Sequence, residues 1–556
     1  MPRWGGGLRR RLSLASRRRI GAALGQPLFA IGFGGATLGA RGNAPPTGVP
    51  VEPWPGDSGN GAAVAAGRFT MQGQTIPAGA EGGAAPWDGN GATEAWRAAL
   101  HGFEFLRDLR ALGGEAARTT ARRLVDDWIT HETRIRTVAW RPDVLAQRLM
   151  QWLVQAEFVC AGADDAFRAR FYAALARQAN YLARVAALAP EGAAQIAVHK
   201  ALIYACLTLP GARRRIGRWT EALEHDIAEQ VLVDGGHVER NPEAHLSALR
   251  DLIDVRANLR AAQEEVPGAL QGAIDRMAPM LRFWRHGDGR LALFNDSTES
   301  RDWLIDMVLT QADARGKPLT AAPHTGFHRM SAHRTLVVMD VGAPPPPGYD
   351  LRAHAGTLAF ELSVGRERLV VNCGAYAGPN LAWRYASRTT AAHSTLIVED
   401  VNSSELLPGG GIGTRPSRVA AERRESEGNV WIDAAHNGYV RAFGLVHKRR
   451  LFLATGGDDL RGEDTLEGAG QRKFAVRFHL HPDVKASPVQ GGASVLLRTA
   501  SGVGWRMRAS GGVTSLQESV YLGTNGEARR TDQIVISAAT RGPTAQVKWA
   551  FSRVGG

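Results

Sequence analysis

The sequence predicts an all-α domain of paired antiparallel helices followed by an antiparallel β-sandwich. Two observations lead to this fold class. Apolar residues recur at helical spacing from Glu94 to about Trp284, and beyond residue 320 short segments alternate apolar and polar residues between Gly, Asp and Asn turns. Helices first and strands second, without βαβ alternation, argue against a Rossmann fold or a TIM barrel. A chain of 556 residues is too long for one ordinary core, so we expect two large domains.

Residues 1–92 are expected to form a basic tail and a Gly/Pro-rich linker, partly disordered. The start is basic and contains a twin-arginine-like Ser16-Arg17-Arg18-Arg19, followed by an uncharged run from Ile20 to Ala40. These features fit an export signal, but the run is weakly apolar and no clean small-x-small cleavage site follows it. A disordered basic tail is therefore favoured over a signal peptide. No transmembrane segment is expected elsewhere.

Residues 93–319 are expected to form the helical domain. In "PDVLAQRLMQWLVQAEFV", Leu145, Leu149 and Trp152 fall on one face, and Pro142 suits a first helical turn. The segments "DDAFRARFYAALARQANYLARV" and "PGALQGAIDRMAPMLRFW" repeat this pattern. Several helices of similar length joined by short links are typical of paired antiparallel helices.

Residues 320–556 are expected to form the sandwich. The segments "RTLVVMDVG", "GTLAFELSVGRERLVVNCG", "HSTLIVED", "VWIDAAHNGY", "HKRRLFLAT" and "KFAVRFHLHP" have the alternation and the turn residues of short antiparallel strands.

The formal net charge of +13 suits a polyanionic partner such as nucleic acid, an anionic membrane or an acidic polysaccharide. Charge does not choose among these, and arginine-rich codon usage is an equal alternative explanation. No phosphate-binding loop is present, so nucleic acid is not the expected partner. The three cysteines, Cys160, Cys206 and Cys373, are too few and too scattered for a disulfide framework or a CxxC zinc site.

The stretch "DGGHVERNPEAHL" concentrates polar residues beside two glycines. Asn241, Pro242 and Glu243 make a good helix start, because Asn caps, Pro fits the first helical position and an acid favours the positive end of the dipole. His237 precedes this helix and His245 lies one turn into it, so both could face an anion at the helix N-terminus. The alternatives at this point are a polar site and a purely structural helix start.

These residues resemble a known family. The stretches "LVDGGHVERNPEAHLSALRDLIDVR", "LRFWRHGDGRLALFND", "RAHAGTLAFELSVGRERLVVNCGAY", "WRYASRTTAAHSTLIVED" and "HNGYVRAFGLVHKRRLFL" together are similar to the heparinase II/III-like proteins, over roughly residues 50 to 550. The resemblance implies an incomplete α/α toroid followed by an antiparallel β-sandwich. It also implies a polysaccharide lyase that acts on uronic-acid polymers.

β-Elimination removes the C5 proton of a uronate, which requires neutralisation of the carboxylate and a group that takes the proton. The resemblance implies Asn241 or His237 as the neutralising residue. Arg352 stands where the family has the first His of an H-x-H element; Arg can neutralise a carboxylate but cannot act as a base.

The resemblance also implies a structural zinc in some members. The corresponding positions here are His354, Asn372 or the adjacent Cys373, and His393. Asn is a poor zinc ligand whereas Cys is a good one, so the set is incomplete. No other cofactor is required.

The family uses a toroid tyrosine as acid or base, but no Tyr occurs between Ala205 and Gly348. Replacement candidates are Tyr376, Tyr385 and Tyr439, with His237 and His245 as options that are not tyrosines. Tyr439 in "HNGY" is the chosen candidate, and a core tyrosine bonded to backbone is the alternative.

Four residues are predicted to bind substrate: Arg240, Trp140, Arg384 and Arg388. Trp140 precedes Arg141-Pro142 in a predicted loop, where it could stack on a sugar ring. Arg384 and Arg388 could hold a polyanion, or could instead be solvated or pair with acids.

The sequence thus predicts a polysaccharide lyase for an acidic, uronic-acid-containing glycan. The alternative is a glycan-binding or envelope-polysaccharide assembly protein on a lyase scaffold, suggested by the absent tyrosine and by Arg352 and Asn372. The resemblance implies a periplasmic or envelope location, and a cytoplasmic one follows if the N-terminus is not an export signal. The sequence leaves the oligomeric state open.

Overall fold

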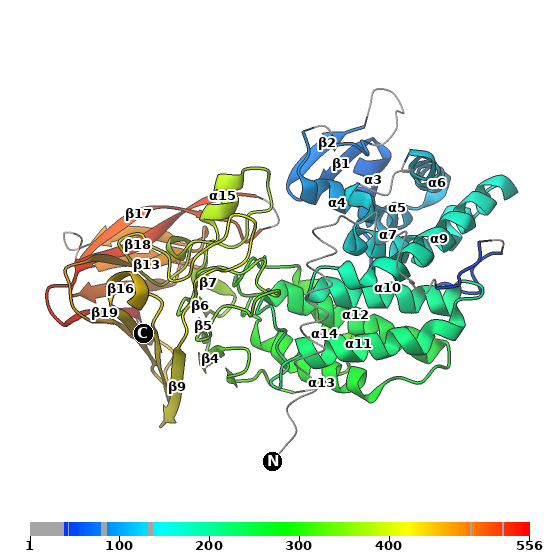
Figure 1. The fold of residues 1–556 in the computed structure, drawn as a ribbon. Helices are drawn as coiled ribbons and strands as arrows, with labels where there is room; N and C mark the ends of the chain where they lie inside the picture. The colour runs from blue at the N-terminus through cyan, green and yellow to red at the C-terminus, as the bar shows by residue number, and fades with distance from the viewer. Residues whose placement is uncertain are drawn as a thin grey trace, which may run out of the picture. The chain divides into compact units, whose positions relative to one another are not determined.

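The computed structural model describes residues 38–42, 44–78, 86–89, 91–131, 137–314, 316–489, 492, 494–524 and 527–555. The twin-arginine-like segment lies outside the described residues. The chain divides into two compact units, which we call the helical unit (Met1–Ile227 and Asp251–Gln271) and the β unit (Ala228–Arg250 and Gly272–Gly556). Figure 1 shows the helices in blue to green and the strands of the β unit in green to red.

The helical unit contains mostly antiparallel-type α-helical segments and one small hairpin. Its elements are α3 (Ser58–Ala65), β1 (Arg68–Met71), β2 (Gln74–Pro77), α4 (Glu94–Gly102), α5 (Phe105–Leu112), α6 (Gly114–His131), η1 (Val138–Trp140), α7 (Pro142–Val154), α8 (Ala156–Cys160), α9 (Asp165–Val185), η2 (Ala186–Leu188), α10 (Ala193–Thr208) and η3 (Arg213–Arg215). The chain passes between the two units within α11 (Ile216–Gln230), α12 (Pro242–Ala261) and α13 (Gly268–Phe283).

Helix starts follow the sequence signals. Pro142 occupies the first turn of α7 as predicted. Asp164 caps α9 by accepting a hydrogen bond from the Phe167 N–H at 2.6 Å, and Thr93 caps α4 through the Trp96 N–H at 3.0 Å. Among the described residues, no helix combines the length and the apolar character needed to span a membrane.

A buried ion cluster joins residues 50–57 to the helices of the helical unit. The Lys200 ammonium lies 2.9 Å from Glu52, 3.0 Å from Asp251 and 2.6 Å from Asp254, and the Trp54 indole N–H donates to Asp254. All of these side chains are buried. Part of the segment expected to be linker is therefore a structured part of the helical unit, together with α3 and the β1–β2 hairpin.

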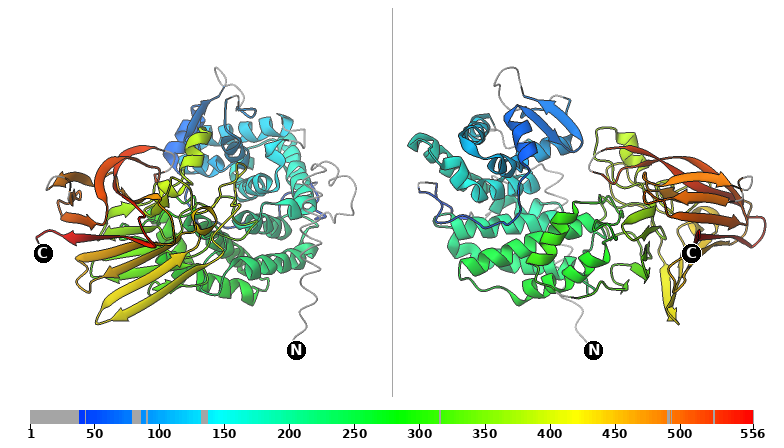
Figure 2. Two further views of the ribbon diagram at one scale, coloured as in Figure 1. Left: turned by 60° about the vertical axis from the view of Figure 1, so that its left-hand side comes forward. Right: turned by 180° about the vertical axis from the view of Figure 1, so that it is seen from behind.

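The β unit contains two large antiparallel sheets. One has eight strands in the order β14 (Lys485–Val489), β15 (Ser494–Arg498), β16 (Gly504–Ser510), β19 (Thr544–Arg553), β12 (Asp459–Glu467), β11 (Val446–Leu453), β10 (Asn429–His436) and β9 (Val419–Ser426). The two views in Figure 2 follow this sheet to its yellow edge strand β9.

The other sheet has nine strands. Its order is β17 (Val513–Tyr521), β18 (Arg529–Ala539), β13 (Lys473–Leu480), β7 (Glu367–Val371), β6 (Phe360–Val364), β5 (Thr335–Asp340), β4 (Phe327–Ala332) and β3 (Ala321–Ala322), with β8 (Leu396–Val398) paired to β13. The short helices of this unit are α14 (Asp302–Gln311), α15 (Leu381–Ala386), η4 (Thr390–Ala392) and α16 (Val440–Phe443). The fold class read from the sequence, helices followed by an antiparallel sandwich, is confirmed.

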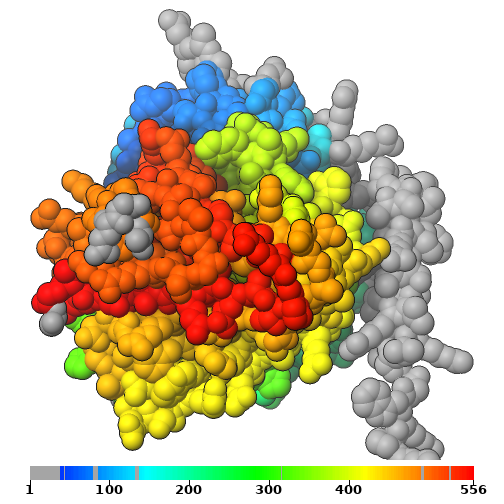
Figure 3. All heavy atoms as spheres, turned by 90° about the vertical axis from the view of Figure 1, so that its left-hand side faces the viewer, coloured from blue at the N-terminus to red at the C-terminus, as the bar shows by residue number. Residues whose placement is uncertain are grey.

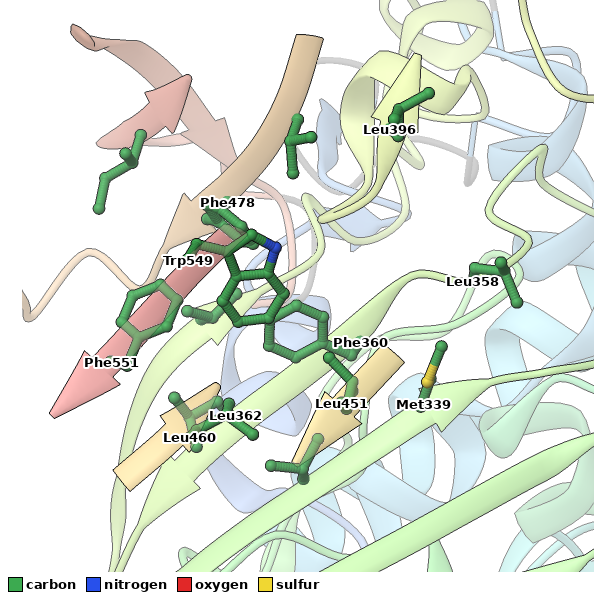
Figure 4. Packing of buried hydrophobic residues seen from close by; sticks show 14 of the residues in the cluster. Met339, Leu358, Phe360, Leu362, Leu396, Leu451, Leu460, Phe478, Trp549 and Phe551 are labelled. Atoms are coloured by element: carbon green, nitrogen blue, oxygen red, sulfur yellow. The ribbon is translucent and has the colours of Figure 1, made fainter. Parts of the chain in front are cut away.

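Residues of both sheets share one apolar core. Phe360 of the nine-stranded sheet stacks on Trp549 of the eight-stranded sheet, with ring centroids 5.4 Å apart and planes 5° from parallel. Figure 4 shows these rings with Phe478, Phe551 and the surrounding aliphatic side chains. The alternating pattern is the cause, because every second residue of a strand faces the same side.

A buried carboxylate lies within this core. Asp464 accepts two hydrogen bonds from Arg449, at 2.7 and 3.0 Å, one from the Trp549 indole at 2.8 Å, and is 2.7 Å from His447. Arg449 also donates to the carbonyls of Leu358 and Ser394, which precede strands of the other sheet. Burial opposes ionisation of Asp464, but the charge of Arg449 and the hydrogen bond of His447 hold its pKa below the usual range. Arg449 therefore ties the two sheets together.

Replacing Arg449 tests this role. Arg449→Ala leaves Asp464 buried without its main counter-charge, and we expect a loss of about 3–5 kcal/mol in the free energy of unfolding of the β unit. Denaturant-induced unfolding would measure it. Arg450→Ala is the matched control: Arg450 is the next residue of β11, its side chain is 55% exposed and it pairs with Asp433, so a loss below about 1 kcal/mol is expected. Equal losses in the two variants would contradict the assignment.

Candidate functional site

The segment from Asp234 to Asn241 is fastened to the sandwich by two side chains. Asp234 accepts hydrogen bonds from the N–H groups of His324 and Thr325, at 2.7 and 2.8 Å, and from the Thr325 hydroxyl at 2.6 Å. Arg240 has a φ of +53° and donates to the carbonyls of Thr325, Gly326 and Ala343 and to Asp340. The prediction that Arg240 binds substrate is corrected, since it is buried and its donors hold this segment in place.

Asn241 is the N-cap of α12. Its side-chain oxygen accepts from the N–H groups of Glu243 and Ala244, at 2.8 and 2.9 Å, and its amide donates to the Asn295 carbonyl. Asn295 in turn donates to the Arg240 carbonyl at 3.0 Å. The structural interpretation of this helix start thus holds, and the buried Asn241 amide is engaged with backbone rather than open to a substrate carboxylate.

His237 and His245 are both buried, with relative exposures of 1%. The His237 ring lies 3.1 Å from Gln230, and the His245 ring lies 2.9 Å from the Met277 carbonyl. Burial lowers the pKa of His237 to about 4 and that of His245 to about 3. Both are neutral core residues in this structure, which corrects their prediction as groups that reach a substrate.

His354 and His393 form a hydrogen-bonded pair beside Asn295. The His393 Nδ1 lies 2.7 Å from the Thr389 carbonyl and so must donate to it. Its Nε2 therefore accepts from the His354 Nδ1, 3.1 Å away, and the His354 Nε2 carries a lone pair. This Nε2 atom is buried without a hydrogen-bond partner and lies 3.9 Å from Asp296.

Asp296 carries the exposed edge of this group. Its side chain is 21% exposed, and the Arg352 guanidinium, itself 64% exposed, lies 4.0 Å away. Burial opposes ionisation of Asp296, but His354, Arg352 and Arg384 outweigh it and hold its pKa below the usual range. We call Asp296, Arg352 and Arg384 the Arg352 surface. It presents two exposed cations and one carboxylate.

The predicted zinc ligands do not converge. The Asn372 amide donates to the Leu293 carbonyl at 3.1 Å and its oxygen accepts from the Ser394 N–H, while the Cys373 thiol lies 3.4 Å from His479. Within the described ranges, no group of three or more His, Cys, Asp or Glu side chains could hold a metal ion. The residues present therefore do not fit the zinc site that the family resemblance implied, and we assign it no role.

Three further predicted residues are structural. Tyr439 is fully buried and its hydroxyl donates to the Leu396 carbonyl at 2.9 Å, so the core interpretation replaces the proton-transfer prediction. Arg388 is buried and donates to the carbonyls of Ala353 and Gly411. Trp140 is 2% exposed and packs against Trp128 and Tyr181. None of the three is open to a sugar.

Sequence reasoning missed Asn295 and Asp296. Both have positive φ, +51° and +65°, a backbone conformation that Asn and Asp tolerate better than most residues. The signal was present as an Asn-Asp pair directly after the apolar run 291–294. Only the fold shows that this turn meets His354, whose N–H donates to the Asn295 side chain at 3.1 Å.

The fold and these residues define a polysaccharide-lyase scaffold, and comparisons with known proteins agree. The family described as Heparinase II/III N-terminus matches residues 110–313, and the one described as Heparinase II/III-like, C-terminal matches residues 314–550. The chain belongs to the heparinase II/III-like family. Its architecture is an incomplete α/α toroid followed by an antiparallel β-sandwich.

Individual relatives support this membership. The chain is 34% identical over 526 residues to FtsZ-localized protein C of Caulobacter vibrioides, covering 91% of this chain and 90% of that protein. A crystal structure of heparinase III matches with a TM-score of 0.74 at 13% identity, covering 99% of this chain and 91% of that one. Heparan sulfate lyase HepC from Pedobacter heparinus matches with a TM-score of 0.58 at 17% identity, covering 98% and 88%.

Asn241→Ala tests the capping role. The variant removes a buried N-cap, so we expect a loss of about 1–2 kcal/mol in the free energy of unfolding. Asn380→Ala is the control, because Asn380 caps the exposed helix α15 through the N–H groups of Ala382 and Trp383; its loss should stay within about 0.5 kcal/mol. An Asn241→Ala variant as stable as the parent would contradict the role.

The buried histidines predict acid sensitivity. Burial lowers the folded-state pKa of His245 to about 3, so below the ordinary His pKa the unfolded state binds more protons and stability falls as pH falls. From about pH 7.5 to about pH 5, His245 alone should cost about 2 kcal/mol. Unfolding measured at both pH values should show a smaller decrease for His245→Gln, whereas His333→Gln, at an exposed position, should match the parent.

Proposed function

We propose that this protein binds an acidic, uronic-acid-containing polysaccharide at the Arg352 surface. The observation that carries the proposal is the division of polar groups in the β unit. Arg352 and Arg384 are exposed, whereas Asn241, Arg240 and Arg388 are buried and bonded to backbone carbonyls. An exposed guanidinium recognises a carboxylate through paired N–H groups, and Asp296 can accept hydrogen bonds from sugar hydroxyls.

The scaffold and the relatives support a polysaccharide as the ligand. The family to which the chain belongs includes polysaccharide lyases, and the net charge of +13 suits a polyanion. The relative from Caulobacter vibrioides is named for localisation with FtsZ. Together these features favour a role in handling polysaccharide of the cell envelope, on a lyase scaffold.

A second candidate function is cleavage of the same polymer by β-elimination. It is favoured by the His354 Nε2, an unpartnered lone pair beside Asp296. In this reaction the Nε2 would take the C5 proton of a uronate while Arg352 neutralises its carboxylate. The C4–O bond would break as the C4–C5 double bond forms, and the departing oxygen would take the proton back from His354.

Binding ranks ahead of cleavage because the described β unit offers no open His for this step. The Nε2 atom of His354 is buried, and Tyr439 is enclosed in the core. Cleavage requires exposure of the His354 Nε2 to substrate, whereas binding uses the surface as it stands.

Arg352→Ala tests the proposal. Alginate, hyaluronan and heparan sulfate would be titrated into the full chain at low salt, and absorbance of unsaturated uronate ends would be followed in parallel. Loss of a charged hydrogen-bonding group should weaken binding about five- to tenfold. Arg530→Ala, which removes an exposed Arg paired with Glu518, should bind as the parent does.

Each result decides between the candidates. Binding that depends on Arg352, without new absorbance, is the expected outcome. Absorbance that rises in the parent and is lost in His354→Gln would establish cleavage as the function. Binding unaffected by Arg352→Ala, with no absorbance, would overturn both.

A further inference from the structure

The outer face of the eight-stranded sheet carries a hollow remote in sequence from the Arg352 surface. It has a volume of about 440 Å³ and is lined by residues of β11, β12, β16 and β19, a size within the usual range of small-ligand sites. Figure 3 views the molecule from the side of these strands, with the red of β19 between orange and yellow segments.

Strand register explains the hollow. Ala550 of β19 lies opposite Arg461 of β12 on one side and Arg508 of β16 on the other. One strand position pair away, Lys548 lies between Glu463 and Ser510 in the same way. A short side chain between two long ones leaves space above it, so Ala550 forms the floor while Arg461 and Arg508 form the walls.

The wall on the β11 side is aromatic. Phe452 pairs with Arg461 across β11 and β12, and the guanidinium of Arg461 lies 5.6 Å from the Phe452 ring centre. Trp431 of β10 lies beyond it, with ring centroids 5.1 Å apart. These rings stand half-buried on a face that solvent would otherwise cover with polar groups. With the Ala550 methyl they give the hollow an apolar side that fits the C–H face of a sugar ring.

The charges around the hollow are mixed, with cations in excess. Arg450 pairs with Asp433, Arg461 with Asp459 at 2.6 Å, and Lys548 lies 3.6 Å from Glu463. For Arg508, which is exposed, no hydrogen bond or ion pair is found within the described part of the chain. Arg508 is thus a cation available to a ligand, and Glu463 is an acceptor within reach of hydroxyl groups.

We propose that this hollow is a second, non-catalytic binding site for an anionic polysaccharide. The polymer would place a sugar ring over Ala550 against Phe452 and a carboxylate on Arg508. Nucleic acid fits less well, because its evenly spaced phosphates would meet Glu463 and Asp433. A polymer that carries both hydroxyls and carboxylates uses the acids as well as the cations.

The site would act independently of the Arg352 surface and extends the proposed function rather than depending on it. Two sites on one chain that engage the same polymer raise the overall affinity through effective concentration, without any new contact. A chain with a single site would lose this gain.

The test fills the hollow without changing charge. Ala550→Leu places a larger side chain on the floor, and Arg508→Gln removes the free cation while keeping a polar side chain. We expect each to weaken binding of full-length protein to alginate or hyaluronan about five- to tenfold at low salt, with unchanged circular dichroism. Neutral dextran is the uncharged probe and should not bind with this dependence.

Matched controls sit on the same sheet. Ala420→Leu makes the same change on the outer side of edge strand β9, and Arg498→Gln removes an exposed Arg of β15. Both should bind as the parent does. The proposal is overturned if Ala550→Leu binds like Ala420→Leu, if no polyuronate binds, or if an acidic peptide or single-stranded DNA shows the same dependence more strongly.

The two sites can be separated by one comparison. Binding lost in Arg352→Ala but kept in Ala550→Leu would leave the proposed function standing and remove the hollow. Binding kept in Arg352→Ala and lost in Ala550→Leu would keep the hollow and remove the Arg352 surface.

Discussion

The buried guanidinium of Arg240 is the contact on which the candidate site depends. It satisfies three backbone carbonyls and pairs with Asp340 at 2.6 Å, while its own carbonyl accepts from Asn295. Asn295 then receives the Asn241 amide and the His354 N–H. One buried, fully engaged cation thus sets the positions of the α12 cap, the Asn295–Asp296 turn and the His354–His393 pair. A buried charge persists only when it is paired in this way.

Polar groups engaged in this manner are costly to recruit for a ligand. Redirecting the Asn241 amide or the Arg388 guanidinium would leave buried carbonyls without donors, and each such loss costs about 1–3 kcal/mol. The same holds for the Tyr439 hydroxyl and its bond to Leu396. Exposed cations such as Arg352 and Arg508 carry no such penalty. This difference separates residues that build the β unit from residues that can meet a polyanion.

Membership in a lyase family fixes the scaffold but leaves the chemistry to specific side chains. The tyrosine expected of the helical domain is absent from the sequence between Ala205 and Gly348, and the metal-ligand positions are Asn372 and Cys373, which face other partners. What remains is a surface and a hollow that combine cations, acceptors and apolar area. That combination suits recognition of a charged, hydroxyl-rich polymer.

The sequence by itself determined the order of helices and strands, the start of α7 at Pro142 and the cap at Asn241, because these depend on periodicity and on local hydrogen bonds within a few residues. It also placed Arg352 and His354 in the site region through family resemblance. Tertiary structure alone decided which polar side chains are open. Arg240 and Arg388 bind carbonyls about 85 and 35 positions away in the chain, and Trp140 packs on rings from other helices. Contacts of such sequence separation leave no local pattern, so the same residue types can be read equally as ligands or as core.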